Sequence, residues 1–252
     1  MKILENPDAA RSYQEDTDMG ALSITYAGHS AVIIEIAGAR VAVDPWLKGN
    51  PLCPSALQNP GKLDLIAVTH GHADHASDVV RVQKESGAMV AATYELAMIL
   101  ISEGVPAEKV VPMNKGGSVE CGSVTVSLTD AFHSSSFDGT HGTVYAGEAC
   151  GVVIAGDSKS VYHAGDTSLF SDMKLIGELF KPTVALLPIG DRFTMGAREA
   201  AKAAALVRAK VASPIHYKTF PLLTGTYREF AHACDALDIA HHEIEVGGTK
   251  SF

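Results

Sequence analysis

The chain has 252 residues, with 20 Lys and Arg against 29 Asp and Glu, so its formal net charge is −9. Its 46% hydrophobic and 19% charged residues are typical of a folded protein and exclude a disordered chain. The acidic balance argues against a sequence-independent nucleic-acid binder and against docking on anionic lipid. Eleven histidines stand against one tryptophan, and clustered imidazoles are the commonest metal ligands.

Residues 1–20 are polar and acidic and contain no apolar core, so they lack the pattern of a signal peptide and are treated as an N-terminal extension. No apolar run approaches the roughly 18 residues that a membrane span needs. The four cysteines have no CxxC spacing and are expected to be free thiols. These features predict a cytoplasmic protein without a membrane partner.

The first half of the chain is expected to open with strands and then to alternate strands and helices. Apolar patterns separated by glycine-containing turns predict strands at 22–27, 31–36 and 40–44. An irregular Pro- and Gly-rich loop, 45–62, comes next. After it we expect strands at 65–69 and 89–92 and helices at 76–85 and 94–104.

The second half repeats this theme. Strands are expected at 123–131, 151–155, 160–165, 183–189 and 210–216, and helices at 171–180, 197–209 and 226–237. The order predicts an α/β fold in which two sheets pack face to face with helices outside, a four-layer αββα sandwich. No Gly-, Ser- or Pro-rich linker divides the halves, so we expect a single domain over 1–252, with 226–252 as a C-terminal helix and tail.

The stretch that carries most chemistry is THGHADH, 69–75, directly after an apolar strand. Its candidate ligands are His70, His72, Asp74 and His75. A strand that ends in a glycine-containing turn can direct these side chains into one pocket. Four such ligands are too many for one catalytic metal that must also hold water. The motif therefore predicts two metal ions a few ångströms apart.

Further candidate ligands follow other predicted strands. His133, Asp166 and His216 each lie at the C-terminal edge of an apolar strand, where open α/β architectures tend to bind ligands. Each alone has a second interpretation as a satisfied core residue, but with the histidine motif they support one another. Asp44 also ends a strand, and the alternative for it is a turn-initiating Asp before Pro.

Several other side chains have two open interpretations. His29 is either an extra acid or oxyanion donor or a histidine of the turn between two strands. Trp46 and Lys218 either contact substrate from loops or serve packing. His163 is interpreted as a hydrogen-bonded core residue. His141 lies in the segment 134–151, which is either a substrate loop or a solvated turn, and the turn is favoured.

The chain resembles the metallo-β-lactamase superfamily from about residue 22 to 220. More narrowly, it is similar to the metal-dependent hydrolases of the UPF0173 family, with the ascorbate-6-phosphate lactonase type as a wider relative. The segments that carry the narrow resemblance are GHSAVIIE (28–35), DPWLKGNP (44–51), THGHADH (69–75), PMNKGG (112–117), AFHSSS (131–136), YHAGDTSLFSDMKLIGELFKPTVALLPIGDRFTMG (162–196) and PIHYKTFP (214–221). The resemblance implies the αββα sandwich, with metals in a cleft at one edge of the two sheets, and it suggests a homo-oligomer.

The resemblance also implies roles for the candidates. His70, His72 and His133 would hold one metal, and Asp74, His75 and His216 the other. Asp166 would bridge them, and Asp44 would orient a ligand from behind. Asp74 would in addition orient the attacking hydroxide. Ligand sets without cysteine suit zinc, which is the first expectation, but manganese, iron or nickel can occupy them.

The expected activity is hydrolysis of an ester, lactone, amide or phosphodiester of a small molecule by a hydroxide that bridges two divalent metals. The alternatives are a metal-dependent nuclease or phosphodiesterase acting on nucleic acid and a non-hydrolytic metal-binding member. The charge of −9 and the lack of a basic, aromatic-interleaved patch disfavour a nucleic-acid partner. A flavodiiron oxidoreductase is disfavoured because His72 stands where HxExD has Glu.

Overall fold

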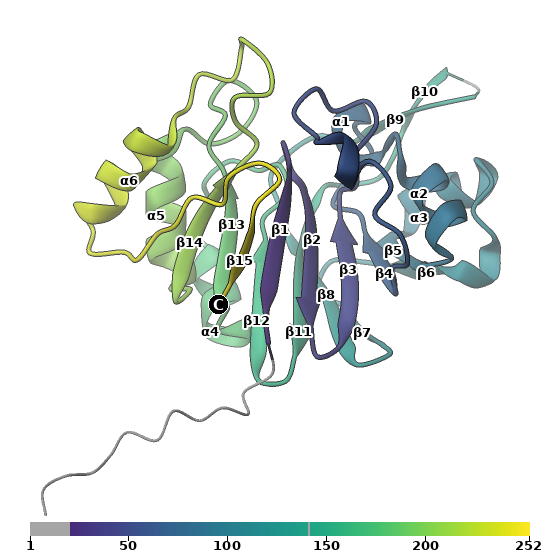
Figure 1. Ribbon diagram of the computed structural model, residues 1–252, viewed down its shortest axis with the longest axis horizontal. Coiled ribbons are helices and arrows are strands. Elements are labelled where there is room, and N and C mark those ends of the chain that lie inside the picture. Colours follow the sequence, from purple (N-terminus) through teal and green to yellow (C-terminus); the bar gives the residue numbers. More distant parts are fainter. Residues whose placement is uncertain (1–20, 141) are drawn as a thin grey trace, which may run out of the picture.

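Two large β-sheets form the centre of the protein in the computed structural model, which describes residues 21–140 and 142–252 (Figure 1). The strand order of the first sheet is β15-β1-β2-β3-β4-β5-β6. Its strands are β1 (Ser23–Gly28), β2 (Ala31–Ile36), β3 (Ala39–Val43), β4 (Leu65–Ala67), β5 (Met89–Thr93), β6 (Val110–Met113) and β15 (Thr249–Ser251). The strands from β3 to β6 pair in parallel, whereas β1, β2 and β3 form an antiparallel meander.

The second sheet has the order β14-β13-β12-β11-β8-β7. Its strands are β7 (Ser118–Cys121), β8 (Val124–Asp130), β11 (Cys150–Gly156), β12 (Lys159–His163), β13 (Val184–Pro188) and β14 (Val211–Ile215). The pairs from β12 to β14 are parallel and those from β7 to β12 antiparallel. A separate hairpin, β9 (Ser136–Gly139) with β10 (Gly142–Tyr145), belongs to neither large sheet.

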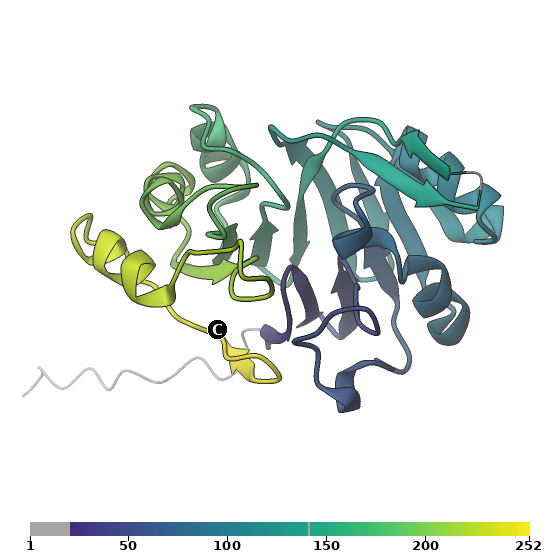
Figure 2. The same ribbon diagram turned by 90° about the horizontal axis from the view of Figure 1, so that it is seen from above.

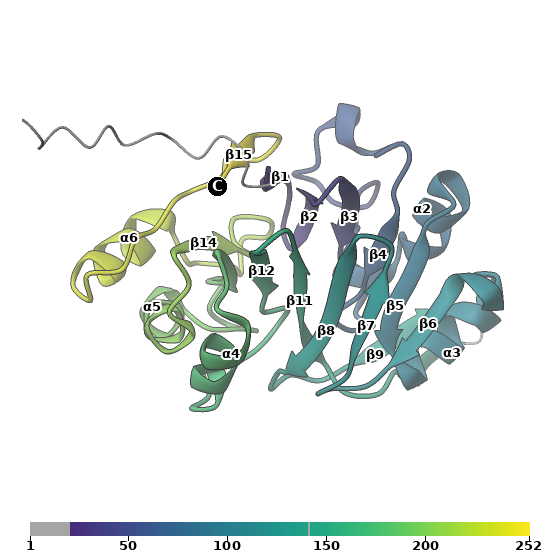
Figure 3. The ribbon, with the colours of Figure 1, turned by 90° about the horizontal axis from the view of Figure 1, so that it is seen from below.

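Helices cover the outer faces of both sheets, as Figure 2 shows from above and Figure 3 from below. Those beside the first sheet are α2 (Val79–Ser86) and α3 (Tyr94–Ser102), and those beside the second are α4 (Met173–Phe180), α5 (Ala197–Val207) and α6 (Tyr227–Asp235). The short helix α1 (Ala73–Ala76) lies above the upper ends of the strands in Figure 1. Short 3-10 helices occupy Ser55–Leu57 and Ala107–Lys109. The predicted αββα sandwich is confirmed.

Alternating side chains of the strands build the core. In β2, Val32 and Ile34 join one buried cluster with Val126 and Val152 of the opposite sheet, whereas Ile33 faces the second cluster under α2 and α3. A period of two residues sends successive side chains to opposite faces, so one apolar strand serves both layers. The two sheets are therefore locked together, and the loops at their edge are held in place.

Most predicted elements appear within a few residues of their expected bounds. The helix expected over 76–85 is α2, which runs from Val79 to Ser86, and it is preceded by an unpredicted short helix, α1, that begins at Ala73 inside the histidine motif. Strands β6, β7, β9, β10 and β15 were not predicted, since they are short and lack a clear apolar period. The N-terminal extension and His141 lie outside the described residues.

The four cysteines, all in the described part of the chain, are free thiols as predicted. Among the helices of residues 21–140 and 142–252, none has the length and apolarity to cross a bilayer.

Candidate metal centre

The predicted ligands meet at one edge of the sandwich because their strands run in the same direction. In the first sheet, β1, β3 and β4 all end at this edge, and in the second sheet β8, β12 and β14 do so. The polar residues follow directly on these strand ends, so the topology brings together seven side chains spread over nearly 150 residues: His70, His72, Asp74, His75, His133, Asp166 and His216.

The first group of possible metal ligands is His70, His72 and His133, whose ligand atoms lie within 4.8 Å of one another. His70 Nε2 is 2.9 Å from His72 Nδ1. Gly71 between them is required by close packing, because a Cβ at this position would lie 2.7 Å from the carbonyl oxygen of Ser136. The glycine thus lets the segment entering β9 close against the histidine turn.

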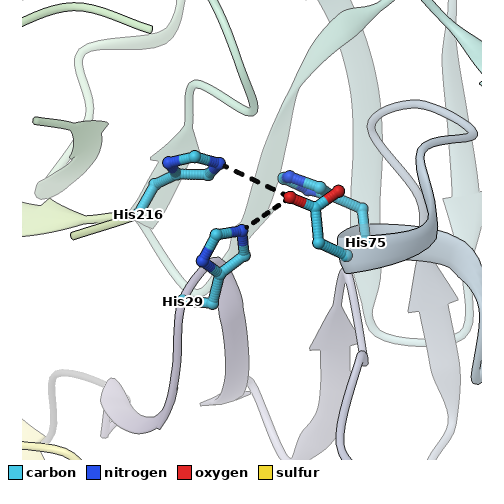
Figure 4. A group of neighbouring side chains, drawn as sticks. His29, His75 and His216 are labelled. Carbon is cyan, nitrogen blue, oxygen red and sulfur yellow. Dashed lines mark hydrogen bonds and ion pairs between the residues drawn. The ribbon is translucent and has the colours of Figure 1, made fainter. Parts of the chain in front are cut away.

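The second group is Asp74, His75 and His216, and His29 joins it with all ligand atoms within 4.8 Å (Figure 4). Asp74 and His75 lie on α1, which begins directly after His72. His216 Nε2 is 3.9 Å and His29 Nε2 is 3.0 Å from Asp74 Oδ2.

Asp166 lies between the two groups. Its Oδ2 is 3.6 Å from His133 Nε2 of the first group and 3.1 Å from His216 Nε2 of the second, and its Oδ1 is 3.3 Å from His75 Nε2. One carboxylate therefore faces both groups, which is the arrangement that a bridging ligand requires.

Asp44 lies behind the second group and is fully buried. Its Oδ2 is 2.7 Å from His75 Nδ1, and both of its oxygens accept hydrogen bonds from Thr69. A carboxylate on Nδ1 places the proton there and turns Nε2 toward Asp166. Asp44 thus holds the His75 ring in a fixed orientation.

Charges in the centre are strongly coupled. Burial opposes a charge on His75, but Asp166 and Asp44 outweigh it and raise the pKa of this imidazole well above its usual range. Burial likewise opposes ionisation of Asp166, yet His216 and His75 hold its pKa well below the ordinary value. In the first group, burial lowers the pKa of His70, His72 and His133, which keeps these rings neutral as metal ligation requires.

Four buried polar atoms of the centre have no hydrogen-bond partner in the described part of the chain: His75 Nε2, Asp166 Oδ1 and both ring nitrogens of His216. Buried polar groups are almost always partnered, so each such atom calls for an explanation. The three that converge on one another, His75 Nε2, His216 Nε2 and Asp166 Oδ1, would each gain a partner in a bound cation. The donor set of imidazole and carboxylate fits divalent transition metals.

Three residues of the centre have a strained backbone. His29, Asp44 and His216 have φ values of 58°, 47° and 56°, in the left-handed region that L-residues rarely adopt. Such strain persists only where the surrounding structure enforces it, and it is frequent at functional sites. Position 190, which packs against the turn at His216, has room only for glycine. A Cβ on Gly190 would lie 2.4 Å from the carbonyl oxygen of His216.

The two predicted substrate contacts are placed differently. Trp46 lies beside the second group, with its ring 5.3 Å from that of His29 and 5.9 Å from that of Phe220. Lys218 has an exposed side chain whose ammonium lies 3.2 Å from Glu243 and over the ring of Tyr217. Its charge is thus paired with a carboxylate outside the two ligand groups.

His163 is buried and hydrogen-bonded: its Nε2 lies 2.9 Å from the carbonyl oxygen of Ser30, and its Nδ1 accepts from the backbone of Gly165. This agrees with its interpretation as a core residue.

Two threonines of the site were missed by sequence reasoning. Thr69 bonds Asp44, and Thr219 lies 2.9 Å from His29 Nδ1. Thr69 is the first residue of the histidine motif and Thr219 lies three residues after His216, so proximity to a ligand was the available signal. It does not distinguish a supporting hydroxyl from an ordinary loop threonine.

Most of the chain is similar in sequence and in fold to known proteins. A family model described as a beta-lactamase superfamily domain matches residues 39–217. A UPF0173 metal-dependent hydrolase of Rubrobacter xylanophilus is 44% identical over 234 residues, which cover 91% of this chain and 96% of the relative. One of Methanopyrus kandleri is 45% identical over 227 residues, covering 89% and 95%.

Among solved structures, Igni18, a metallo hydrolase from the archaeon Ignicoccus hospitalis, superposes with a TM-score of 0.82 at 36% identity, covering 92% of this chain and 98% of its own. The metallo-beta-lactamase fold protein YhfI of Bacillus subtilis has a TM-score of 0.70 at 14% identity, covering 92% and 100%, and shows the shared fold alone.

Proposed function

The chain belongs to the UPF0173 metal-dependent hydrolases of the beta-lactamase superfamily, and from this premise we propose that it hydrolyses an ester, lactone, amide or phosphodiester of a small molecule with two divalent cations. His70, His72 and His133 would hold one cation, Asp74, His75 and His216 the other, and Asp166 both. Zinc suits this ligand set best, and manganese, iron and nickel are the alternatives.

The observation that carries the proposal is the position of Asp166, whose Oδ2 lies 3.6 Å from His133 Nε2 and 3.1 Å from His216 Nε2. A carboxylate within reach of two separate ligand groups is placed as a ligand shared by two cations would be. The unpartnered buried atoms of His75 and His216 support the same interpretation.

When bound, the cations supply a hydroxide nucleophile near neutral pH and Lewis-acid stabilisation of the oxyanion or leaving group. The chain's own residues prepare the site for this chemistry. Asp44 keeps the Nδ1 proton on His75, so that Nε2 would be the ring nitrogen that binds a cation. Asp74, whose side chain is 30% exposed, is placed to accept a hydrogen bond from the attacking water and orient it.

The proposed substrate is small and carries little charge at the reacting group. The chain has a net charge of −9, which repels a polyanion such as nucleic acid. Trp46 and Phe220 lie next to each other beside the second group, and Phe220 is 37% exposed. An apolar portion of the substrate would contact the ring of Phe220.

The test combines metal analysis with a hydrolysis panel. Protein purified without chelator is expected to contain about two cations per chain and to cleave one class among lactones, nitrophenyl phosphodiesters, thioesters and β-lactams. His70→Ala should lose at least one cation and reduce turnover by 100-fold or more. Fewer than one cation per chain, with unchanged turnover in His70→Ala, would contradict the proposal. Cleavage of single-stranded RNA alone would favour the nuclease alternative.

A further inference from the structure

We propose that His29 and Thr219 are a pair of positioning residues that hold Asp74 in the orientation needed to bind the second cation. The inference deepens the proposed function and rests on it, because Asp74 is one of the ligands assigned to that cation. It gives His29 a role different from proton donation to substrate, and it assigns a role to Thr219.

The hydrogen-bond donors and acceptors of His29 define the arrangement. The ring is fully buried, with Nε2 3.0 Å from Asp74 Oδ2 and Nδ1 2.9 Å from Thr219 Oγ1. An ionised carboxylate can only accept, so Nε2 must carry the proton that it donates to Asp74. Nδ1 of the neutral ring is then an acceptor, and the hydroxyl of Thr219 donates to it. Thr219 thus supplies the donor that Nδ1 needs in the tautomer that holds the carboxylate, and its other contact, to the carbonyl oxygen of Tyr217, is longer at 3.4 Å.

A positioning role distinguishes His29 from its neighbours in the second group. His75 Nε2 and His216 Nε2 are buried without a hydrogen-bond partner among the described residues, as expected of atoms that await a cation. Both nitrogens of His29 already have partners in the protein. The oxygen of Asp74 that accepts from His29 is Oδ2, which also lies 3.9 Å from His216 Nε2. A carboxylate oxygen has more than one lone pair, so Oδ2 can accept from His29 and still face the rest of the second group.

The pair is held rigidly from both sides. The carbonyl oxygen of His29 accepts hydrogen bonds from Tyr26 Oη at 2.8 Å and from the backbone N–H of His216 at 2.6 Å. The ring itself packs 4.0 Å from that of His216 and 5.3 Å from that of Trp46. The ring therefore lacks room to swing, and its hydrogen bond to Asp74 is set in advance of metal binding.

The experiment titrates metal-free protein with Zn²⁺ or Co²⁺ against a chromogenic chelator and resolves two dissociation constants, with the Co²⁺ absorption spectrum as a second readout. Thr219→Val removes the hydroxyl at nearly constant volume and is expected to weaken the second cation by about 10- to 100-fold while leaving the first unchanged. Thr219→Ser should restore wild-type affinity. Thr224→Val, on the same loop with an exposed hydroxyl bonded to Asp191, is the matched control and should bind both cations normally.

A second pair of variants separates positioning from ligation. His29→Gln keeps an N–H near the position of Nε2 and should bind the second cation more tightly than His29→Leu, which should still bind it, about 10- to 100-fold more weakly than wild type. Loss of the second cation in His29→Leu as complete as in Asp74→Ala would make His29 a ligand and overturn the inference. Unchanged affinity in both Thr219→Val and His29→Leu would also overturn it.

The thermal midpoint of each metal-free variant shows whether it is folded. A failure of the proposed function would be seen in the wild-type protein, which would then bind fewer than two cations. In that case the inference would fall together with the proposal.

Discussion

The carboxylate of Asp44 binds three groups of the candidate centre: the backbone N–H and the hydroxyl of Thr69, and the ring of His75. It accepts from the backbone and the hydroxyl of Thr69 at 2.8 and 2.7 Å, and its Oδ2 is 2.7 Å from His75 Nδ1. Burial opposes its ionisation, but His75 outweighs this effect and lowers the pKa of Asp44. Because the carboxylate is completely enclosed, its charge depends on these partners, and so does the orientation of His75.

The expected effect of Asp44→Asn follows from this geometry. The amide group would face at least one donor with its own N–H₂, leaving a buried donor unsatisfied. We expect a loss of about 1–3 kcal/mol in unfolding free energy and weaker cation binding by about 10- to 100-fold. Urea denaturation and metal analysis measure the two effects.

Asp64→Asn is the control for this substitution, because Asp64 accepts a backbone hydrogen bond from Arg40 at the exposed surface. It should leave both quantities near wild type. Equal effects of the two substitutions would show that the enclosure of Asp44 is unimportant.

At the scale of elements, α2 anchors the loop 45–62 that brings Trp46 to the site. Asp78, which precedes α2, accepts hydrogen bonds from the backbone of Leu47 and Lys48 at 2.8 and 2.6 Å and from Arg81 Nε at 3.0 Å. Burial raises the pKa of Asp78, but Arg81 and the two backbone N–H groups outweigh it and hold the pKa below its ordinary value. The irregular loop is therefore fixed to a helix by one carboxylate.

Asp78→Asn should lower the unfolding free energy at pH 7 by about 1–3 kcal/mol, because hydrogen bonds to a charged acceptor are lost. A folded-state pKa below the unfolded value means that this stabilisation is present above about pH 4 and is lost as the pH falls through the lowered pKa. Urea denaturation of wild type and variant from pH 7 to pH 3 should therefore show converging stabilities. A difference that stays constant over this range would contradict the charge argument.

Glu85→Gln serves as the control at the element scale. Glu85 pairs with the same arginine but is 35% exposed, and exposed ion pairs contribute about 0–1 kcal/mol. Its removal should change stability much less than that of Asp78.

At the scale of the whole molecule, the proposed ligands come from both sheets. His70, His72, Asp74 and His75 follow β4 of the first sheet, whereas His133, Asp166 and His216 follow β8, β12 and β14 of the second. Bound cations would link the two sheets at the edge where their loops meet. Metal binding is therefore expected to contribute to the stability of the sandwich as well as to its chemistry.

Removal of the cations by chelator should lower the thermal midpoint. A cation present at about 1,000 times its dissociation constant stabilises by about 4 kcal/mol, which corresponds to roughly 8–16 °C for a chain of this size. Differential scanning calorimetry before and after dialysis against chelator measures this shift. Chelator should lower the thermal midpoint of His70→Ala less than that of the wild type. An equal decrease in the two proteins would indicate that the chelator removes cations bound outside the candidate centre.

Much of the architecture could be predicted because its signals are local. The apolar period of β2, the glycine turns of the first meander and the helix 197–209 are read within a few residues, and the structure has them nearly as expected. Short elements such as β15, which pairs with β1 from the far end of the chain, carry no period of their own. Their pairing depends on a partner more than 200 residues away.

The residue order alone was enough to predict the αββα class, the histidine motif and the strand ends that carry His133, Asp166 and His216, because strand direction places such ends at a common edge. The packed structure was needed to find that Asp166 faces both ligand groups, that Asp44 bonds His75, and that Thr219 reaches His29 across 190 residues. These contacts depend on how the two sheets pack and on the direction in which the strained turns point their side chains. The residue types within a short window of sequence determine neither the packing of the sheets nor these side-chain directions.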